Sequence, residues 1–406
     1  MFWQNRFKHF VDRLRVYNIP LRLQLWNGTT FDLGNLGDLG ETPLVTLTIR
    51  SASALKFFLP PTLDSLGHAY VEGKIDVEGR LTDVLEAVAR LAANSADGLR
   101  RRGARSVLHT KKLDVAAISY HYDVSNEFYS LWLDRNMVYS CAYFGDGTET
   151  LDVAQERKID HILTKLNLRR GDTLLDIGCG WGALILRAAE KYGVKALGIT
   201  LSQKQYDWTR EQIARANLGD RCEVRIEDYR DVIGKFDRIT SVGMFEHVGL
   251  KNLRGYFGCI NKLLTDDGMV MNHGITSTDP DSVDFPLGGG DFINRYVFPH
   301  GEVPHIGLLL EAMSAAGLEP VDIENLRRHY AITMERWVER FESASPKLKT
   351  LTSEKNWRIW RAYLAGCAYG FKQNWISIHQ VLAIKALPGR AVHLPLTRDY
   401  MYPKSL

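Results

Sequence analysis

Residues 173–182 read Thr-Leu-Leu-Asp-Ile-Gly-Cys-Gly-Trp-Gly, and this stretch decides which fold the chain can adopt. Its apolar first half predicts a buried parallel strand, after which every second residue is glycine. A helical apolar pattern follows from Ala183 to Ala189, and Gly193 stands where a helix stop is expected. Strand, glycine turn and helix form the first unit of a doubly wound α/β sheet, whose ligands lie beyond the carboxyl ends of the strands.

The glycine spacing distinguishes between two classes of nucleotide ligand. A dinucleotide site requires G-x-G-x-x-G and an acidic residue ending the second strand, whereas this chain has G-x-G-x-G and continues from residues 196–200 into Leu-Ser-Gln. Asp176 adds a negative charge beside the turn, which disfavours a phosphate. A phosphate-free cation such as S-adenosylmethionine (SAM), which carries a sulfonium and an ammonium group, fits better. A tight turn without a ligand is the plain alternative, and the strand–turn–helix–strand context disfavours it.

The doubly wound pattern continues beyond the glycine turn. Ser202 is the expected N-cap of the second helix, and Asp267-Gly268 is expected to form a turn before the fifth strand. The third strand is followed by Glu227-Asp228-Tyr229 and the fourth by Met-Phe-Glu-His-Val at 244–248, so polar side chains gather at the strand ends. The predicted elements are strands at 196–200, 222–226, 236–242 and 269–275 and helices at 155–166, 202–216 and 252–264.

Residues 1–98 predict a smaller α+β domain without a catalytic constellation. Alternating patterns predict strands at 21–25 and 45–50 with a turn at Asn27-Gly28, residues 67–79 predict a second hairpin, and residues 83–91 predict an amphipathic helix. We therefore expect an N-terminal domain at 1–98, a basic linker at 99–117 and a catalytic domain at 118–406.

The expected linker carries six cationic and no anionic residues between positions 99 and 112. It is either a solvated charge run or a segment attracted to anionic lipid headgroups, at about 1 kcal/mol per basic residue.

Two later segments indicate how a substrate could be held. Residues 277–304 contain three consecutive glycines and several prolines, which predicts a long lid or substrate loop, followed by an amphipathic helix at 305–317. The tail at 333–386 is rich in aromatic residues and has a helical period. Those aromatic residues either pack a core or line an acyl-chain pocket.

Composition limits the possible functions. The net charge of 406 residues is only +3, which argues against binding nucleic acid through bulk charge. Five cysteines are dispersed without a metal-binding spacing, which favours a reducing cytosol and no zinc site. No apolar run is long enough to cross a bilayer, so a lipid substrate requires a cytoplasmic protein that visits the membrane surface.

Five segments carry a family resemblance: Tyr-Ser-Cys-Ala-Tyr at 139–143, the glycine motif at 175–182, Gly-Ile-Thr-Leu-Ser at 198–202, Val-Gly-Met-Phe-Glu-His-Val at 242–248 and Arg-Tyr-Val-Phe-Pro-His-Gly at 295–301. Through them residues 118–386 resemble the cyclopropane-fatty-acyl-phospholipid synthases and the mycolic acid cyclopropane synthases. Residues 1–98 are similar to the sterol-carrier-like, lipid-binding N-terminal domain of the full-length bacterial synthases. Many methyltransferases share the glycine motif, whereas the first and fourth segments are much more specific.

The resemblance implies two sets of site residues. SAM is expected at Tyr139, Ser140, Gly178, Gly180, Thr200, Leu201, Gln205, Asp228 and Tyr229, and the glycine turn adds Asp176 and Gly182. A bicarbonate ion that acts as base is expected at Cys141 and Ile275, through backbone groups, and at the side chains of Glu246, His273 and Tyr330. Cys367 matches a cysteine assigned as catalytic in the family, although its apolar helical surroundings argue against a nucleophile.

The expected reaction is attack of a cis alkene in a phospholipid acyl chain on the SAM methyl group, followed by proton removal by bicarbonate and closure of a cyclopropane ring. Tyr143, Phe144, Phe245 and Tyr330 are candidates to stabilise the intervening carbocation. The expected partners are unsaturated phospholipids at the membrane surface and a second copy of the chain. Four alternatives remain: a lipid C-methyltransferase that gives a branched or methylene chain, a small-molecule or RNA methyltransferase, an NAD oxidoreductase and a non-enzymatic lipid carrier.

Overall fold

The computed structural model describes residues 2–34, 45–95, 124–281, 286–299, 301–387, 389 and 394–402. The chain forms two compact units. The first gathers residues 1–104, 283–299 and 337–375, and the second gathers 105–282, 300–336 and 376–406. The expected division was linear along the chain, whereas this one assigns two later segments to the N-terminal unit. The expected linker at 99–117 lies outside the described residues.

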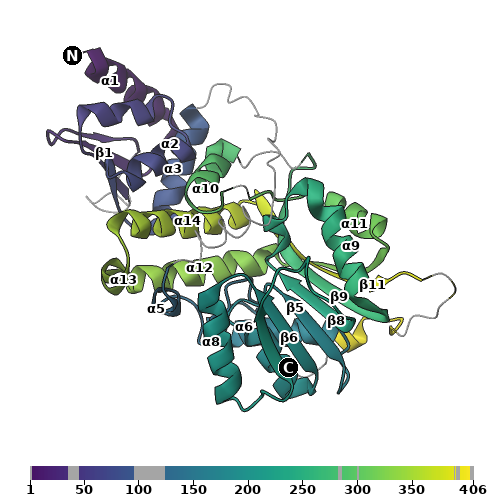
Figure 1. Ribbon diagram of the computed structural model, residues 1–406. Helices are drawn as coiled ribbons and strands as arrows, with labels where there is room; N and C mark the ends of the chain where they lie inside the picture. The colour runs from purple at the N-terminus through teal and green to yellow at the C-terminus, as the bar shows by residue number, and fades with distance from the viewer. Residues whose placement is uncertain are drawn as a thin grey trace. The chain divides into compact units, whose positions relative to one another are not determined.

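The second unit is built on a seven-stranded sheet in the order β10-β11-β9-β8-β5-β6-β7 (Figure 1). The five strands from β9 to β7 run parallel, and β11 and β10 add an antiparallel edge. This arrangement confirms the doubly wound α/β prediction. The strands are β5 Thr173–Ile177, β6 Lys195–Thr200, β7 Cys222–Ile226, β8 Phe236–Val242, β9 Leu264–Ser277, β10 Leu318–Asn325 and β11 Ile376–Lys385.

Helices cover both faces of this sheet because each presents one apolar stripe to it. Ile159 of α6 and Ile185 of α7 pack into the core on one face, and Phe257 of α9 and Met313 of α11 pack into the core on the other. The predicted cap is present, since the Ser202 hydroxyl accepts from the Gln205 N–H at the start of α8. The helices are α5 Asn126–Ser130, α6 Leu151–Lys165, α7 Ala183–Arg187, α8 Gln203–Arg215, α9 Leu253–Leu263, α11 Ile306–Ala315 and α12 Arg327–Ser343, of which residues 337–343 belong to the first unit.

Three features of this sheet differ from the sequence predictions. The helical reading of the tail extended through residues 376–385, which form strand β11, and strand β10 was not predicted. Nine of the ten β11 residues are buried, so the strand lacks the alternation that would have identified it. The turn expected at Asp267-Gly268 is part of strand β9, at an irregularity where the register against β8 shifts between Phe236 and Arg238.

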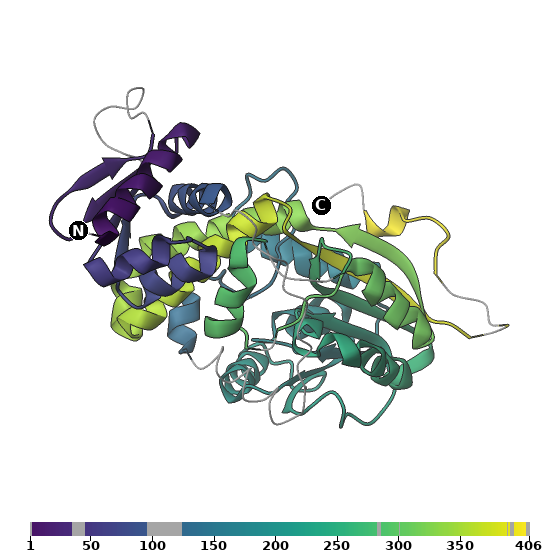
Figure 2. The same cartoon turned by 90° about the horizontal axis from the view of Figure 1, so that it is seen from above.

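The first unit contains a four-stranded sheet in the order β2-β1-β3-β4, with helix α1 against it (Figure 2). The strand pair β1–β2 turns at Asn27-Gly28 as predicted. The hairpin expected at 67–79 is wrong, because residues up to Val71 belong to helix α2 and the following strand pairs with β3. The elements are α1 Phe2–Leu14, β1 Leu21–Leu25, β2 Thr30–Asp32, β3 Val45–Ile49, α2 Leu63–Val71, β4 Ile75–Glu78, α3 Leu81–Ser95, α10 Gly289–Tyr296, α13 Ser345–Leu351 and α14 Glu354–Lys372.

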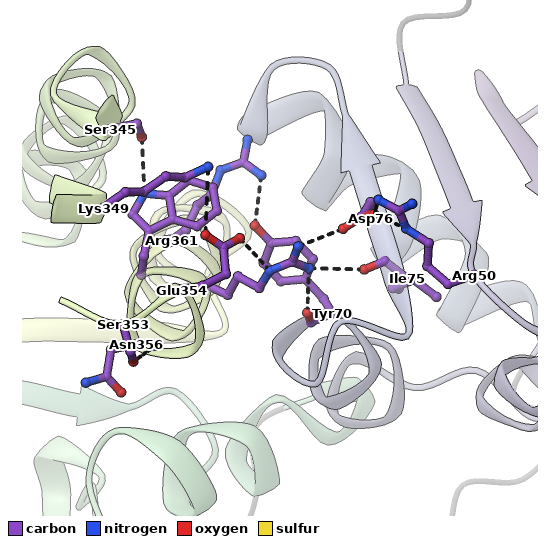
Figure 3. A network of polar contacts seen from close by, with 12 residues as sticks. Arg50, Tyr70, Ile75, Asp76, Ser345, Lys349, Ser353, Glu354, Asn356 and Arg361 are labelled. Carbon is purple, nitrogen blue, oxygen red and sulfur yellow. Dashed lines mark hydrogen bonds and ion pairs between the residues drawn. The ribbon is translucent and has the colours of Figure 1, made fainter. Parts of the chain in front are cut away.

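Arginine side chains of α14 tie that helix to the N-terminal residues of the same unit (Figure 3). The Arg358 guanidinium pairs with Asp76 at 2.7 Å and donates to the carbonyl oxygens of Tyr70 and Ile75. The Arg361 Nη1 donates to the Tyr70 hydroxyl at 3.0 Å. These bonds explain why a segment far along the chain belongs to the first unit.

The segment expected to form a long loop at 277–304 includes helix α10, which belongs to the first unit. Within that unit Arg295 pairs with Asp64, and the Tyr296 ring stacks on His68. Residues 282–285 and 300 of this segment lie outside the described part. Across the described ranges, no helix is both long and apolar enough to pass through a bilayer.

Candidate active site

A cavity of about 470 Å³ opens in the second unit at the carboxyl ends of β5, β6, β7 and β8. This is the position that the doubly wound topology predicts for a ligand. Ten of the eleven residues expected to bind SAM line the cavity: Tyr139, Ser140, Asp176, Gly178, Gly180, Thr200, Leu201, Gln205, Asp228 and Tyr229.

The glycine turn forms the floor of this cavity. Gly178 and Gly180 have φ angles of 78° and 54°, in the left-handed region that glycine adopts without strain. Gly182, the eleventh expected residue, does not line the cavity. A Cβ at Gly182 would lie 2.4 Å from the Thr209 methyl group, so this glycine allows close packing against α8 instead.

Asp176 is the penultimate residue of strand β5, and its carboxylate is buried beside the cavity. Its Oδ1 accepts a hydrogen bond from the Thr240 hydroxyl at 2.7 Å. Burial raises the pKa of Asp176 to about 6. A cationic ligand would favour its ionised form, whereas a phosphate would be repelled.

Polar and aromatic groups lie at the ends of β6 and β7. The Thr200 hydroxyl donates to Gln205 Oε1 at 2.7 Å, which fixes the orientation of that amide. The Asp228 carboxylate pairs with Arg230 at 2.7 Å, and the Tyr229 ring meets Tyr256 edge-on at 5.3 Å. Side-chain amides, carboxylates and rings of this kind suit the ribose and adenine of a nucleoside.

The Tyr139-Ser140 segment is held by helix α6. Gln155 Nε2 donates to the Ser140 carbonyl oxygen at 2.8 Å, and Lys158 Nζ donates to the Ser140 hydroxyl at 2.9 Å. Lys158 lines the cavity and was missed from the sequence. The available signal was its place one turn after Gln155 on the face of α6 that also carries Ile159 and Ile162.

Glu246, in the turn after β8, and His273, on β9, are a second set of polar residues near the end of β8. Val242 and His273 form the last residue pair between β8 and β9. Two residues further along β9, the Ile275 N–H donates to Glu246 Oε1 at 2.7 Å instead of to a carbonyl of β8. Within the described part of the chain, the buried Glu246 Oε2 and both ring nitrogens of His273 have no hydrogen-bond partner. Burial raises the pKa of Glu246 to about 7 and lowers the pKa of His273 well below its ordinary value.

Cys141, through its sulfur, and Tyr330, through its N–H, both contact the Leu326 carbonyl oxygen. Ile275 lies opposite Ile378 of β11, whose carbonyl oxygen accepts from the Leu326 N–H at 2.9 Å. The Leu326 carbonyl oxygen in turn lies 3.8 Å from Cys141 Sγ and accepts from the Tyr330 N–H at 2.9 Å. The five residues expected to hold bicarbonate therefore lie on neighbouring segments of one unit.

The unpartnered atoms suit bicarbonate. A neutral His273 ring offers one N–H donor, and Glu246 Oε2 offers an acceptor for the single O–H of that anion. Unpaired buried polar atoms are costly, which favours a ligand that bonds to them. The Ile275 N–H is already used by Glu246, so only its carbonyl group remains for a ligand.

Two candidate residues lack the surroundings that their candidate roles require. Tyr143 stacks between His161 and His329, with ring centroids at 4.3 and 4.6 Å, so neither ring face is open to a carbocation. Cys367 belongs to the first unit and does not line the cavity, and burial raises its pKa to about 12. A thiol with that pKa is protonated and a poor nucleophile near pH 7.

Comparison with known proteins gives consistent matches. A family model described as mycolic acid cyclopropane synthetase matches residues 109–381, and a second, described as a domain of unknown function, matches residues 3–98. The chain is 45% identical to a probable fatty acid methyltransferase of Pseudomonas putida, over 96% of this chain and 98% of the relative. It is 36% identical to the cyclopropane-fatty-acyl-phospholipid synthase of Escherichia coli K12, over 84% and 88%.

Among solved structures, mycolic acid cyclopropane synthase CmaA1 complexed with SAH and CTAB matches with a TM-score of 0.65 and 35% identity, over 68% of this chain and 99% of that chain. These findings define the class of protein as a SAM-dependent methyltransferase. The chain belongs to the mycolic acid cyclopropane synthetase family, whose members modify lipids.

Proposed function

We propose that this protein transfers the methyl group of SAM to the cis double bond of an unsaturated phospholipid acyl chain and closes a cyclopropane ring. The observation that carries the proposal is that Glu246 Oε2, in the turn after β8, and the His273 imidazole, on β9, are both buried without a partner in the unit that holds the cavity. The synthase of Escherichia coli, 36% identical, bears the name of this activity.

When bound, SAM supplies an electrophilic methyl group and bicarbonate supplies a base. The residues of the chain orient and shield both. Glu246 is fixed by the Ile275 N–H, so its free oxygen has a defined direction for holding bicarbonate. Because the His273 imidazole stays neutral, it can donate one hydrogen bond without adding positive charge beside a developing cation.

The aromatic rings near this group have separate roles in the proposal. A Cβ at Gly274 would lie 2.3 Å from the Phe245 ring, so the bare glycine lets that ring pack directly on β9. Phe144, Phe245 and Tyr330 are buried and remain candidates to face the carbocation without bonding to it. Burial also excludes water, which would otherwise trap the cation.

The proposed methyl acceptor is a phospholipid acyl chain, and the proposed site of action is the membrane surface. An acyl chain within a phospholipid is reached only at a membrane surface, so the protein acts there, and we propose that it does so as a homodimer. The absence of a strong net charge gives no support to a nucleic-acid acceptor.

Incubation of the full chain with SAM and vesicles of an unsaturated phospholipid tests this proposal by mass spectrometry. The expected product has one additional CH2 in an unsaturated acyl chain, and vesicles with saturated chains serve as the control. Methyl transfer to the headgroup, or equal modification of saturated chains, would contradict it.

A second candidate is a lipid C-methyltransferase that leaves a methyl branch or a methylene group. It is favoured by the match to the probable fatty acid methyltransferase of Pseudomonas putida, 45% identical over nearly the whole chain. NMR of the product separates the two candidates, since only a ring has cyclopropane protons, whereas a methylene product keeps vinyl protons and a branched product has an added methyl group.

A further inference from the structure

Lys158 is a buried cation at the cavity that no assigned role explains. It lies on α6 with 2% of its surface exposed, and its Nζ donates to the Ser140 hydroxyl at 2.9 Å. It forms no ion pair with any residue that the structure describes. Burying an ammonium group without an anion costs several kcal/mol, so a ligand anion is the natural complement.

The titratable groups around Lys158 do not neutralise its charge by a direct ion pair within the described residues. Asp134 and Asp176 favour its charged form, Cys141 is a neutral buried thiol, and His273 is neutral. The two Asp134 carboxylate oxygens accept from the N–H groups of Asn136 and Val138, so that carboxylate is already committed to its own loop. Asp176 instead lines the cavity, as Lys158 does.

Together these residues offer a buried ammonium and a buried carboxylate to the same ligand. An α-amino acid carries the complementary pair, a carboxylate and an ammonium group. We propose that Lys158 binds the α-carboxylate of the methionine part of SAM, with Asp176 facing its α-ammonium group. This inference rests on the proposal that the cavity is the SAM site.

The pKa of Lys158 makes its contribution to ligand affinity depend on pH. Burial lowers the pKa of Lys158 to about 8 in the ligand-free protein, and a bound carboxylate raises it. The contribution to affinity is therefore complete below about pH 8 and declines above it, because binding must then take up a proton.

Calorimetric titration of the full chain and of one variant with two ligands measures the contribution of the ligand's α-carboxylate to the affinity. The two ligands are S-adenosylhomocysteine and its decarboxylated analogue 5′-deoxy-5′-(3-aminopropylthio)adenosine, and the variant is Lys158→Met. We expect the variant to bind S-adenosylhomocysteine about 30-fold more weakly or worse, because one partner of a buried charge pair is removed. It should bind the analogue as well as the wild type does, or more tightly, because the analogue has no carboxylate to lose.

Lys195→Met is the control, since Lys195 is an exposed lysine of the same unit that does not line the cavity. It should change either affinity by less than about fivefold. As a pH readout, the ratio of the Kd of Lys158→Met to that of the wild type should fall between about pH 7 and pH 10, and this ratio cancels the titration of the ligand's own amino group.

Equal losses for both ligands, or a pH-independent ratio, would overturn the inference and leave Lys158 a structural support of Ser140. Failure of the wild type to bind either ligand would instead refute the cavity as the SAM site. If Lys158→Met does not fold, the wild type alone decides, because it must prefer S-adenosylhomocysteine over the analogue by about 30-fold. A preference below about fivefold contradicts the inference.

Discussion

Glu246 is placed to bind a ligand, and its burial lowers the stability of the folded protein. One carboxylate oxygen replaces a missing strand partner for the Ile275 N–H, and the other is buried without a bond. Such a group is kept at a site for what it binds rather than for stability. The proposed reaction therefore makes a prediction for activity and another for stability at this residue.

Glu246→Gln should lower turnover by about 100-fold or more, because the amide cannot hold and orient the base as the carboxylate does. His273→Gln should have a similar effect through loss of the imidazole. Binding of S-adenosylhomocysteine, measured by calorimetry, should stay within about fivefold, since neither residue lines the cavity. Unchanged turnover in both variants would remove the proposed role.

The same Glu246→Gln variant should gain stability relative to the wild type as pH rises. The folded pKa of about 7 lies above the ordinary value near 4.3, so the folded protein binds more protons between these two pH values. The wild type thus loses stability from this carboxyl as pH rises through that window, and the glutamine variant does not. Denaturation in bicarbonate-free buffer should show a relative gain of about 1–3 kcal/mol from pH 5 to pH 8. A constant difference would contradict the buried state of the carboxyl.

Cys367→Ala should retain turnover within about fivefold, because a protonated buried thiol in the first unit is not a nucleophile. The measurement is steady-state turnover beside the Glu246→Gln variant. A loss comparable to that of Glu246→Gln, in a variant with an unchanged melting temperature, would restore a catalytic role to this cysteine.

At the scale of elements, one buried ion cluster fixes helix α6 to strand β10. Lys165 is fully buried and lies 3.0 Å from an Asp322 oxygen and 2.6 Å from a Glu324 oxygen, and His161 of the same helix also pairs with Glu324. Helix α6 also carries Lys158, so its placement sets one wall of the cavity.

Lys165→Met should destabilise the protein by about 3–5 kcal/mol, because the buried carboxylate of Asp322 and the partly buried carboxylate of Glu324 lose a partner. Lys191→Met is the control, since Lys191 is about half exposed and shares Asp160 with Arg187, and it should cost about 0–1 kcal/mol. Urea denaturation measures both. Similar costs for the two variants would show that the buried cluster does not hold α6.

The parallel strands and the glycine turn could be predicted because local patterns determine them. Thr173–Ile177 is mostly apolar and is followed by glycines. Ser202 is a residue type that caps helix N-termini, and it marks the start of α8. Strand β11 could not be recognised, because burial on both faces removes its period. The site residues at strand ends could be predicted from the topology. Lys158 was missed because a lysine on an apolar helix face is recognised as a site residue only when the structure shows the cavity that it lines.

For the whole molecule, the two units are assembled from alternating stretches of the chain. The first unit takes α14 from beyond the catalytic strands, and arginines of α14 bind it to the N-terminal residues of that unit. Such pairings join residues more than 280 positions apart, as between Arg358 and Asp76, so no local sequence pattern could reveal them. The family model for residues 3–98 covers only one part of this unit.

The central claim is that methyl transfer to a double bond is followed by loss of a proton from the added carbon and by ring closure. Reaction of unsaturated phospholipid vesicles with SAM that carries a trideuterated methyl group tests it directly by mass spectrometry and NMR. The proposed mechanism predicts an acyl chain that gains one carbon and two deuterium atoms and contains no alkene carbons in the carbon NMR spectrum. Retention of all three deuterium atoms, or a product with an intact alkene, would contradict it.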